Sequence, residues 1–505
     1  MATPELQSLD PEITQRLPYH FAKRHGVISA RQGHAAMEVW VRPGVSSAAL
    51  AELRRMLGQP IQICELSLAD FEAALNRAYE RGMNHAMQIV GDLGDDMDLA
   101  ELTQNLPKAA DLLESEDDAP IVRLINALLT QAVREGVSDI HIEPFETRSV
   151  VRFRLDGLLR DIVEPQQVLH GVIASRIKIM ARLDIAEKRL PQDGRITLRL
   201  AGRPVDVRVS TLPTGHGERV VMRLLDKQAG RLNLVGLGMN PPTLKSLDHL
   251  IHQPHGIILV TGPTGSGKTT TLYAALSQLD AKRYNIVTVE DPIEYDLDGV
   301  GQTQVNAKIE LTFARALRAI LRQDPDIIMI GEIRDLETAQ IAVQASLTGH
   351  LVLATLHTND AVGAVTRLVD MGVEPFLVAS SLLGVLAQRL VRKLCPQCRQ
   401  AHVPDATEAQ LLEITLQQAE EITINVPGAC AVCSQTGYQG RSGIYELLQV
   451  DDALRGLIHD AASEGRLREH ARTRGMQTLR QDGLRWVREG DTSLEEVLRV
   501  SRETG

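Results

Sequence analysis

A glycine-rich loop between a strand pattern and a helix pattern constrains this chain more than any other feature. The loop reads Gly262-Pro263-Thr264-Gly265-Ser266-Gly267-Lys268-Thr269 and is followed by Thr270. The residues before it, 256–260, are an apolar run, and residues 270–276 have a helical pattern. Strand, loop and helix in this order let backbone N–H groups and the helix N-terminus bind phosphate. The sequence therefore predicts a Mg-ATP site, in which Lys268 reaches the β- and γ-phosphates and Thr269 ligates Mg²⁺.

Acidic residues follow two other buried-strand patterns. Residues 327–330 form one such pattern, and it ends in Gly331 and Glu332. An acid at the carboxyl end of a neighbouring parallel strand lies beside the phosphate loop and can hold Mg²⁺ or its water. We therefore assign this role to Glu332. The alternative is that Glu332 only pairs with Arg334.

The second strand pattern, residues 286–289, runs into three carboxylates, Glu290, Asp291 and Glu294. Hydrolysis needs a carboxylate that orients or deprotonates water in line with the γ-phosphate. Any of the three has the right chemistry, and we favour Glu290. The alternative is an ordinary acidic turn.

Histidines and arginines near these segments are further candidates. His350 and His357 bracket the apolar strand 351–354, and a histidine beside a phosphate site could sense the γ-phosphate or bridge to another subunit. Arg315, Arg318 and Arg322 are spaced to share one helix face. Guanidinium groups there could neutralise phosphate charge in the transition state. The alternatives are satisfied structural histidines and a solvated arginine stripe.

Four of the five cysteines form two Cys-x-x-Cys pairs, Cys395 with Cys398 and Cys430 with Cys433. Two such pairs can present four thiolates to one tetrahedral ion, which predicts a closed, structural zinc site. A redox dithiol fits poorly because two matched pairs occur. Cys64 is expected to be a buried small residue.

The length of 505 residues exceeds what one hydrophobic core serves. Strand and helix patterns alternate from 231 to 391, which predicts a parallel sheet covered on both faces. Residues 92–118 are strongly acidic and read as a linker or as a solvated helix face. The expected domains are an N-terminal domain (1–90), the acidic linker (91–118), a small α+β domain (119–230), the ATPase core (231–394), a tetracysteine segment (395–440) and a helical C-terminal region (441–505).

Composition and charge exclude several classes of protein. The longest apolar stretch, 376–391, is interrupted by Ser380, Ser381, Gln388 and Arg389, so we expect no membrane span. The N-terminus has no secretory-signal pattern, and the cysteine pairs suit a reducing compartment, so a cytoplasmic location is expected. The net charge of -11 argues against a broad nucleic-acid-coating surface.

Taken together, several motifs resemble the secretion ATPase superfamily. Besides the phosphate loop, these are the segments 289–295, 322–326, 331–335 and 348–359. The segments 138–145, 189–195 and 443–447, with the four cysteines, are similar to its assembly branch. Residues 16–26 and 91–97 are most similar to the type II secretion ATPases. The presence of Gly331, where many phosphate-loop ATPases carry Asp, is also the pattern of this family.

The resemblance implies a RecA-like ATPase core, preceded by a PAS-like small α+β domain and an N-terminal α/β domain. It implies that Arg208 and Arg223 of the small domain, and Arg318, Arg322 and Arg334 of the core, contact nucleotide phosphates, and that ATP draws the two domains together. It further implies a hexamer at the cytoplasmic face of a bacterial inner membrane. The N-terminal domain would bind a single-span adaptor, and a polytopic platform protein would receive the motion that assembles a pseudopilus and exports folded proteins.

Three other functions stay open at this point. The type IV pilus extension ATPase shares the motor and the cysteine pairs, and only the N-terminal region distinguishes it. A nucleotide-gated scaffold would bind ATP with slow turnover. A nucleic-acid motor is disfavoured by the net charge.

Overall fold

The computed structural model describes residues 119–200, 203–226 and 233–501, and shorter stretches between residues 13 and 74. The acidic linker expected at 91–118 lies outside the described residues. The chain divides into two compact units. The first unit comprises residues 1–153 and 160–224, and the second unit comprises residues 154–159 and 225–505.

The N-terminal sheet has three strands, β1 (Val27–Gln32), β2 (Met37–Val41) and β3 (Ile61–Glu65). β1 pairs antiparallel with β2, which pairs parallel with β3. Because successive side chains of a strand point to opposite faces, Val39 packs in one apolar cluster and Trp40 in another. Both faces of β2 are therefore covered.

A six-stranded sheet follows, in the spatial order β6-β5-β4-β9-β8-β7. The valines of β8 at positions 205, 207 and 209 are buried, as their alternation predicts, against a core that includes helix α7. Asp206 was expected to face out, but it is also buried, because Arg195 and Thr197 of β7 bond its carboxylate at 2.6 and 2.7 Å. The elements are α7 (Ala119–Glu135), β4 (Asp139–Pro144), β5 (Ser149–Leu155), β6 (Leu158–Val163), α8 (His170–Met180), β7 (Gln192–Leu200), β8 (Arg203–Thr214) and β9 (Gly217–Asp226).

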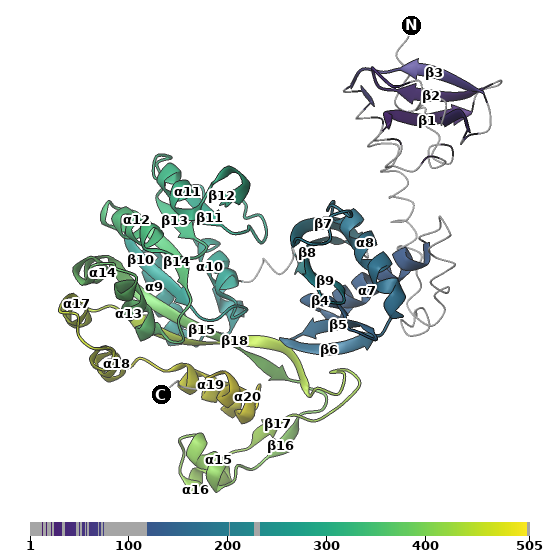
Figure 1. The fold of residues 1–505 in the computed structure, drawn as a ribbon. Helices are drawn as coiled ribbons and strands as arrows, with labels where there is room; N and C mark the ends of the chain where they lie inside the picture. Colours follow the sequence, from purple (N-terminus) through teal and green to yellow (C-terminus); the bar gives the residue numbers. More distant parts are fainter. Residues whose placement is uncertain are drawn as a thin grey trace. The chain divides into compact units, whose positions relative to one another are not determined.

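The second unit is built on a seven-stranded sheet in the order β12-β11-β13-β14-β10-β15-β18 (Figure 1). All neighbouring strands are parallel except β15 and β18. The strands are β10 (Gly256–Thr261), β11 (Ile286–Glu290), β12 (Gly301–Gln304), β13 (Ile327–Ile330), β14 (Leu351–Leu356), β15 (Leu382–Leu394) and β18 (Tyr438–Gln449).

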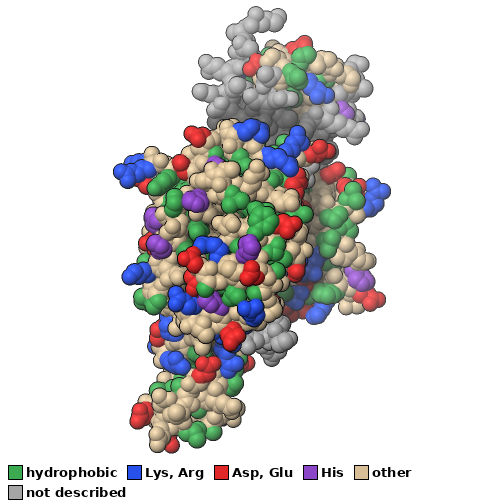
Figure 2. Space-filling model, turned by 90° about the vertical axis from the view of Figure 1, so that its left-hand side faces the viewer, with side chains coloured by type: hydrophobic (Ala, Val, Ile, Leu, Met, Phe, Trp, Pro, Cys, Tyr) green, Lys and Arg blue, Asp and Glu red, His purple; other side chains and the backbone are tan. Residues whose placement is uncertain are grey.

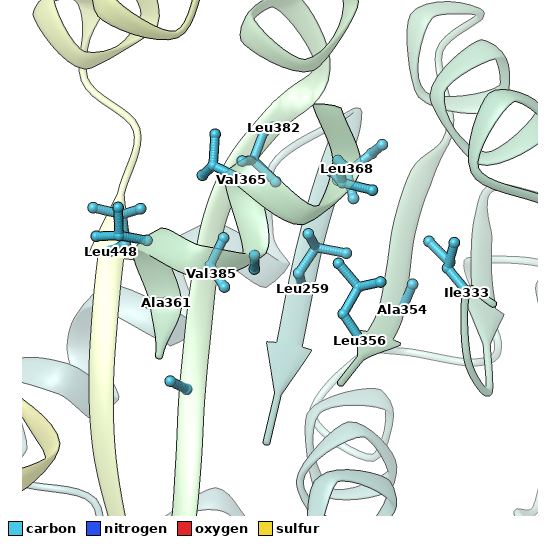
Figure 3. Packing of buried hydrophobic residues seen from close by; sticks show 14 of the residues in the cluster. Leu259, Ile333, Ala354, Leu356, Ala361, Val365, Leu368, Leu382, Val385 and Leu448 are labelled. Atoms are coloured by element: carbon cyan, nitrogen blue, oxygen red, sulfur yellow. The ribbon is translucent and has the colours of Figure 1, made fainter. Parts of the chain in front are cut away.

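Helices cover both faces of this sheet, as the apolar runs predict. Ile258 and Val260 of β10 pack in a cluster with α9 and α10, whereas Leu259 packs in a second cluster with α11 to α14. Figure 3 shows part of the second cluster, with Val365 and Leu368 of α13 near Leu259 and Val385. The helices are α9 (Pro241–Ile251), α10 (Lys268–Leu276), α11 (Phe313–Ile320), α12 (Leu336–Leu347), α13 (Ala361–Asp370) and α14 (Pro375–Ser381).

Strand β18 extends the core sheet beyond the boundaries expected at 394 and 440. It pairs with β15 from Gly384 opposite Gln449 to Leu394 opposite Tyr438. The tetracysteine segment is therefore an excursion between two paired strands of the core sheet. It contains β16 (Gln400–His402), α15 (Ala406–Leu411), α16 (Leu416–Glu421) and β17 (Ile424–Val426).

The chain ends in helices, as expected: α17 (Asp452–His459), α18 (Glu464–Thr473), α19 (Leu479–Arg488) and α20 (Leu494–Val500). No helix among the described residues is long and apolar enough to cross a membrane. The apolar stretch 376–391 instead lies mainly in α14 and β15.

Candidate nucleotide site and tetracysteine cluster

The phosphate loop joins the end of β10 to the start of α10, as its sequence predicts. Gly262, Gly265 and Gly267 all have positive φ angles, of 151°, 79° and 87°. A Cβ at Gly262 would lie 2.5 Å from the carbonyl oxygen of Gln388, and one at Gly267 would lie 2.8 Å from Nε2 of Gln388. Glycine is therefore required at both positions by the backbone conformation and by the close approach of β15.

Gln388 supports the loop from β15 and was not recognised as a site residue from the sequence. Its Nε2 donates to the carbonyl of Ser266 at 2.8 Å, and its Oε1 accepts from the hydroxyl of Thr271 at 2.7 Å. Gln388 is buried. It thus connects the loop, the first turns of α10 and the strand next to β10.

Lys268 is buried at the base of the loop. Its ammonium donates to the carbonyls of Gly262 at 2.9 Å and Pro263 at 3.1 Å. Burial lowers the pKa of Lys268 to about 8; the nearby carboxylate of Glu332 opposes this shift, and the guanidinium of Arg389 adds to it. The lysine is therefore a partly desolvated cation that an anion at the loop would stabilise.

Glu332 brings three of the predicted segments together. It follows β13, and its Oε2 lies 3.5 Å from Nε2 of His357, which follows β14. Arg334 bonds the other carboxylate oxygen of Glu332 and also lies 3.9 Å from Asp291, after β11. Because these strands are parallel, their carboxyl ends meet at the same edge as the phosphate loop. Glu332 pairs with Arg334, but it also lies close enough to Lys268 to act on its pKa.

The segment that carries His357 is fastened to the end of β10. Thr358 donates its backbone N–H to the hydroxyl of Thr261 at 2.9 Å, and the two hydroxyls are 2.7 Å apart. This contact holds the residues after β14 beside the phosphate loop.

Glu290 is buried and accepts hydrogen bonds from three side chains. The donors are the hydroxyls of Tyr273 and of Thr288 (2.5 Å) and the amide of Gln302 (3.1 Å). Burial and the carboxylate of Glu290 raise the pKa of Tyr273, so the phenol keeps its proton and donates it. Asp291 is exposed and Glu294 is half-buried. This set of donors fixes the carboxylate of Glu290.

His350 does not lie at the phosphate loop of its own chain. It precedes β14, and its carbonyl accepts from the N–H of Gly256, the first residue of β10. It is therefore at the amino edge of the parallel sheet, across a six-residue strand, or about 20 Å, from the loop. The expectation that His350 stands beside the phosphates is wrong within one chain, and its bridging to another subunit stays a prediction.

The predicted arginines have partners within their own units. Arg318 on α11 pairs with Glu337, and Arg322 donates to the carbonyl of Arg318 at 2.8 Å. In the first unit, Arg223 donates to Asp139 at 2.8 Å, and Arg208 lies opposite Arg195 in the register of β7 and β8. Their contacts with nucleotide stay predictions.

The four cysteines of the two pairs lie together. Their sulfur atoms are all within 4.8 Å of one another, with separations of 3.6 Å (Cys430 to Cys433), 3.7 Å (Cys398 to Cys433) and 3.8 Å (Cys395 to Cys430). A tetrahedron with Zn–S bonds of about 2.3 Å has edges of about 3.8 Å. The thiols form no disulfide. This geometry fits the predicted closed zinc site.

The cluster fastens the two ends of the excursion between β15 and β18. Cys395 directly follows β15, and its N–H donates to the carbonyl of Gly437, just before β18, at 2.9 Å. Gly437 in turn donates its N–H to the sulfur of Cys433 at 3.2 Å. A metal bound here would stabilise the edge of the sheet. It would not be catalytic, because four protein ligands leave no coordination position open for a substrate.

Charges of both signs are mixed on the face drawn in Figure 2. Lys and Arg side chains (blue) are interspersed with Asp and Glu side chains (red), and several histidines (purple) lie among them. A mixed surface of this kind creates no large field of one sign.

Comparison with known families gives two matches that together span most of the chain. The family described as "Type II/IV secretion system protein" matches residues 114–499, and an N-terminal domain of "GSPII protein E" matches residues 16–79. Among curated proteins, the chain is 58% identical to the type II secretion system protein E of Pseudomonas aeruginosa, over 97% of each chain. It is 56% identical to the type II secretion system ATPase E of Vibrio cholerae, again over 97% of each.

Solved structures with a similar fold include a pilus motor and an ATPase. The pilus retraction motor PilT with bound ADP is 27% identical, with a TM-score of 0.53, over 75% of this chain and 96% of PilT. The ATPase DotB of Legionella pneumophila is 20% identical, with a TM-score of 0.56, over 75% of this chain and 95% of DotB.

Proposed function

The chain belongs to the type II/IV secretion system protein family, and from this premise we propose how its site works as the ATPase of a type II secretion system. The family and the identities above 50% to type II secretion ATPases over nearly the whole chain establish the reaction as ATP hydrolysis coupled to protein export. The observation that carries the proposal is the meeting of Lys268, Glu332 and His357 at the carboxyl edge of one parallel sheet.

In this proposal the loop 262–269 binds the phosphates of ATP. Lys268 exchanges its bonds to the carbonyls of Gly262 and Pro263 for phosphate oxygens, which stabilise its charge more than neutral carbonyls do. Thr269 would hold Mg²⁺, which neutralises phosphate charge when bound. The fold supports nucleotide binding, since the similar motor PilT was solved with ADP.

Carboxylates are the candidates for positioning and deprotonating the water that attacks the γ-phosphate. Glu332, near both Lys268 and His357, would hold Mg²⁺ or its water beside the γ-phosphate. Glu290, buried and held by Tyr273, Thr288 and Gln302, is a fixed negative charge at the same sheet edge. We favour Glu290 as the base, with Asp291 and Glu294 as alternatives.

Assembly and location belong to the same proposal. The match of residues 16–79 to an N-terminal domain of type II secretion protein E supports docking of this region to a single-span inner-membrane adaptor. A hexamer, a polytopic platform protein that receives the motion, and a cytoplasmic position at the inner membrane are further parts of this proposal, which membership of the family supports. Arg208, Arg223, Arg318, Arg322 and Arg334 would contact nucleotide phosphates, and His350 would bridge to another subunit. Zn²⁺ at the four cysteines would be structural.

A Lys268→Ala variant tests the proposal. Hydrolysis should fall at least a hundredfold, because the phosphates lose their closest fixed cation. The exposed Lys282, changed to Ala, is the matched control. In a chromosomal Lys268→Ala strain, secretion of folded enzymes should stop. Near-normal ATP turnover by the purified variant would contradict the assignment of loop 262–269 as the ATP site.

The second candidate is the type IV pilus extension ATPase, which the likeness to a pilus motor favours. The same strain distinguishes the two, because loss of surface pili with intact secretion would reverse the choice. A slow nucleotide-gated scaffold is tested by comparing hydrolysis with and without membrane partners. Salt-sensitive DNA binding by the purified protein would support a nucleic-acid motor.

A further inference from the structure

Arg389 continues β15 alongside the phosphate loop. The parallel register pairs Thr261, the last residue of β10, with Ala387 of β15. Gln388 and Arg389 therefore stand level with the first residues of the loop. They are two of the four polar residues that interrupt the apolar stretch 376–391. Gln388 supports the loop through its hydrogen bonds to Ser266 and Thr271, whereas Arg389 places a positive charge beside it.

Among the described residues, the oxygens that the guanidinium of Arg389 bonds are all neutral. It donates to the carbonyl of Gln388 at 3.1 Å, to the carbonyl of Asn359 at 2.8 Å and to the side-chain oxygen of Asn359 at 3.4 Å. Within the part of the chain that the structure describes, no carboxylate lies within ion-pairing distance of it. Arg392, three residues further along β15, pairs with Glu496 at 2.7 Å.

A half-buried arginine without a contacting anion is costly to hold in place. Burial lowers the pKa of Arg389, and the acids Asp360 and Glu446 act on it only at longer range. Glu446 is itself engaged, because it accepts from the N–H of Ala361 at 2.8 Å. The guanidinium is thus placed where an additional anion would stabilise it.

Arg389 and Lys268 both lie next to the same loop residue, Gly262. A Cβ at Gly262 would lie 3.2 Å from Nη1 of Arg389, and the carbonyl of Gly262 accepts from Lys268 at 2.9 Å. The charge of Arg389 is close enough to lower the pKa of Lys268. Both cations lie next to Gly262, and their hydrogen bonds within the described part of the chain are to carbonyl oxygens, so together they form a site for a multiply charged anion.

We propose that Arg389 is a further phosphate-binding residue, whose guanidinium contacts a phosphate oxygen of the nucleotide in the loop. The inference rests on the proposed function, since it needs the loop to bind ATP. The rival explanation is that Arg389 only tethers Asn359, and with it the segment that carries His357.

Substitutions of Arg389 distinguish the two explanations. Arg389→Gln removes the charge but keeps an amide that can donate to Asn359, whereas Arg389→Lys keeps the charge. Binding of Mg-ATP and of tripolyphosphate, which has phosphates alone, is measured by calorimetry on the full chain. Arg283→Gln, at an exposed arginine of the same unit, is the control, and thermal melting follows the fold.

Loss of a charge-assisted hydrogen bond should weaken binding of both ligands by roughly ten- to a hundredfold in Arg389→Gln. Arg389→Lys should stay within a few-fold of the wild type. If Arg389→Gln binds both ligands as the wild type does, or if Arg389→Lys loses as much as Arg389→Gln, the inference is wrong and the tether explanation holds.

The same measurements also identify a failure of the proposed ATP site and a loss of stability in Arg389→Gln. A wild type that binds no ATP, or a Lys268→Ala variant that binds it equally well, contradicts the proposed function rather than the role of Arg389. If Arg389→Gln melts early, the inference is decided by Arg389→Lys: tripolyphosphate affinity near that of the wild type supports it, and a loss of ten-fold or more overturns it.

Discussion

Gln388 donates a hydrogen bond of 2.8 Å to the carbonyl of Ser266, although the two residues are 122 positions apart in the chain. The same side chain accepts from the hydroxyl of Thr271. The conformation of the phosphate loop is therefore fixed by a strand that follows it in the sequence by more than a hundred residues.

Replacing Gln388 by Ala should loosen this loop. The carbonyl of Ser266 and the hydroxyl of Thr271 would lose buried partners, at a cost of about 2–4 kcal/mol for the two. We expect a lower melting midpoint and a higher KM for ATP. The control is Gln344→Ala, at an exposed glutamine of α12. Unchanged melting and KM in Gln388→Ala would show that the loop holds its conformation without this residue.

Replacing Glu332 by Gln should separate binding from chemistry. The amide has nearly the same shape but no charge to orient water or to attract His357 and Arg334, so kcat should fall roughly 100- to 1000-fold while ATP still binds. Glu310→Gln is the control, because Glu310 is exposed and lies 3.9 Å from Arg315. Single-turnover kinetics and ATP titration measure the two effects. A normal kcat would mean that Glu332 serves only to pair with Arg334.

Removing the metal predicted at the four cysteines should destabilise the edge of the core sheet. Either a chelator or Cys395→Ser would release the ends of the excursion between β15 and β18, and the melting midpoint of this unit should fall. Zinc content, measured on the purified protein, should fall with it. Cys64→Ser, outside the cluster, is the control. A metal-free protein with an unchanged melting profile would count against zinc as a structural element here.

The lowered pKa of Glu496 predicts how the stability of the folded protein changes at acid pH. Burial alone would raise the pKa of Glu496, but hydrogen bonds from Arg499 and Arg392 hold it at about 2, below its ordinary value of 4.5. Because the pKa is lower in the folded state, the carboxylate stabilises the fold fully above about pH 4.5, and this contribution is lost as the pH falls toward 2.

Melting of the wild type and of Glu496→Gln, measured between pH 7 and pH 3, tests this dependence. The variant should melt earlier at pH 7, and the difference should narrow below pH 4.5, since protonated Glu496 resembles glutamine. Glu495→Gln, at the exposed neighbour, should follow the wild type throughout. A difference that stays constant across this range would show that Glu496 does not titrate with folding.

The sequence located most of the residues that the structure brings to the carboxyl edge of the core sheet. The phosphate loop, Glu332, His357 and the acidic turn could be predicted because each directly follows a strand pattern, and parallel strands share their carboxyl edge. The same rule explains the error at His350, which precedes its strand and so lies at the other edge. Gln388 and Arg389 were missed because they appeared only as polar interruptions of an apolar stretch.

By itself, the sequence determined what local order decides: the strand, loop and helix of the phosphate site, the alternation of strands and helices in the core, and the spacing of four cysteines that fits one metal ion. Only the tertiary structure decided which distant segments meet. The pairing of β18 with β15, the bonds of Gln388 to the loop and the position of Arg389 beside Gly262 all join residues far apart in the chain. Such contacts depend on strand order and register in the sheet, and neither is encoded in the spacing of neighbouring residues.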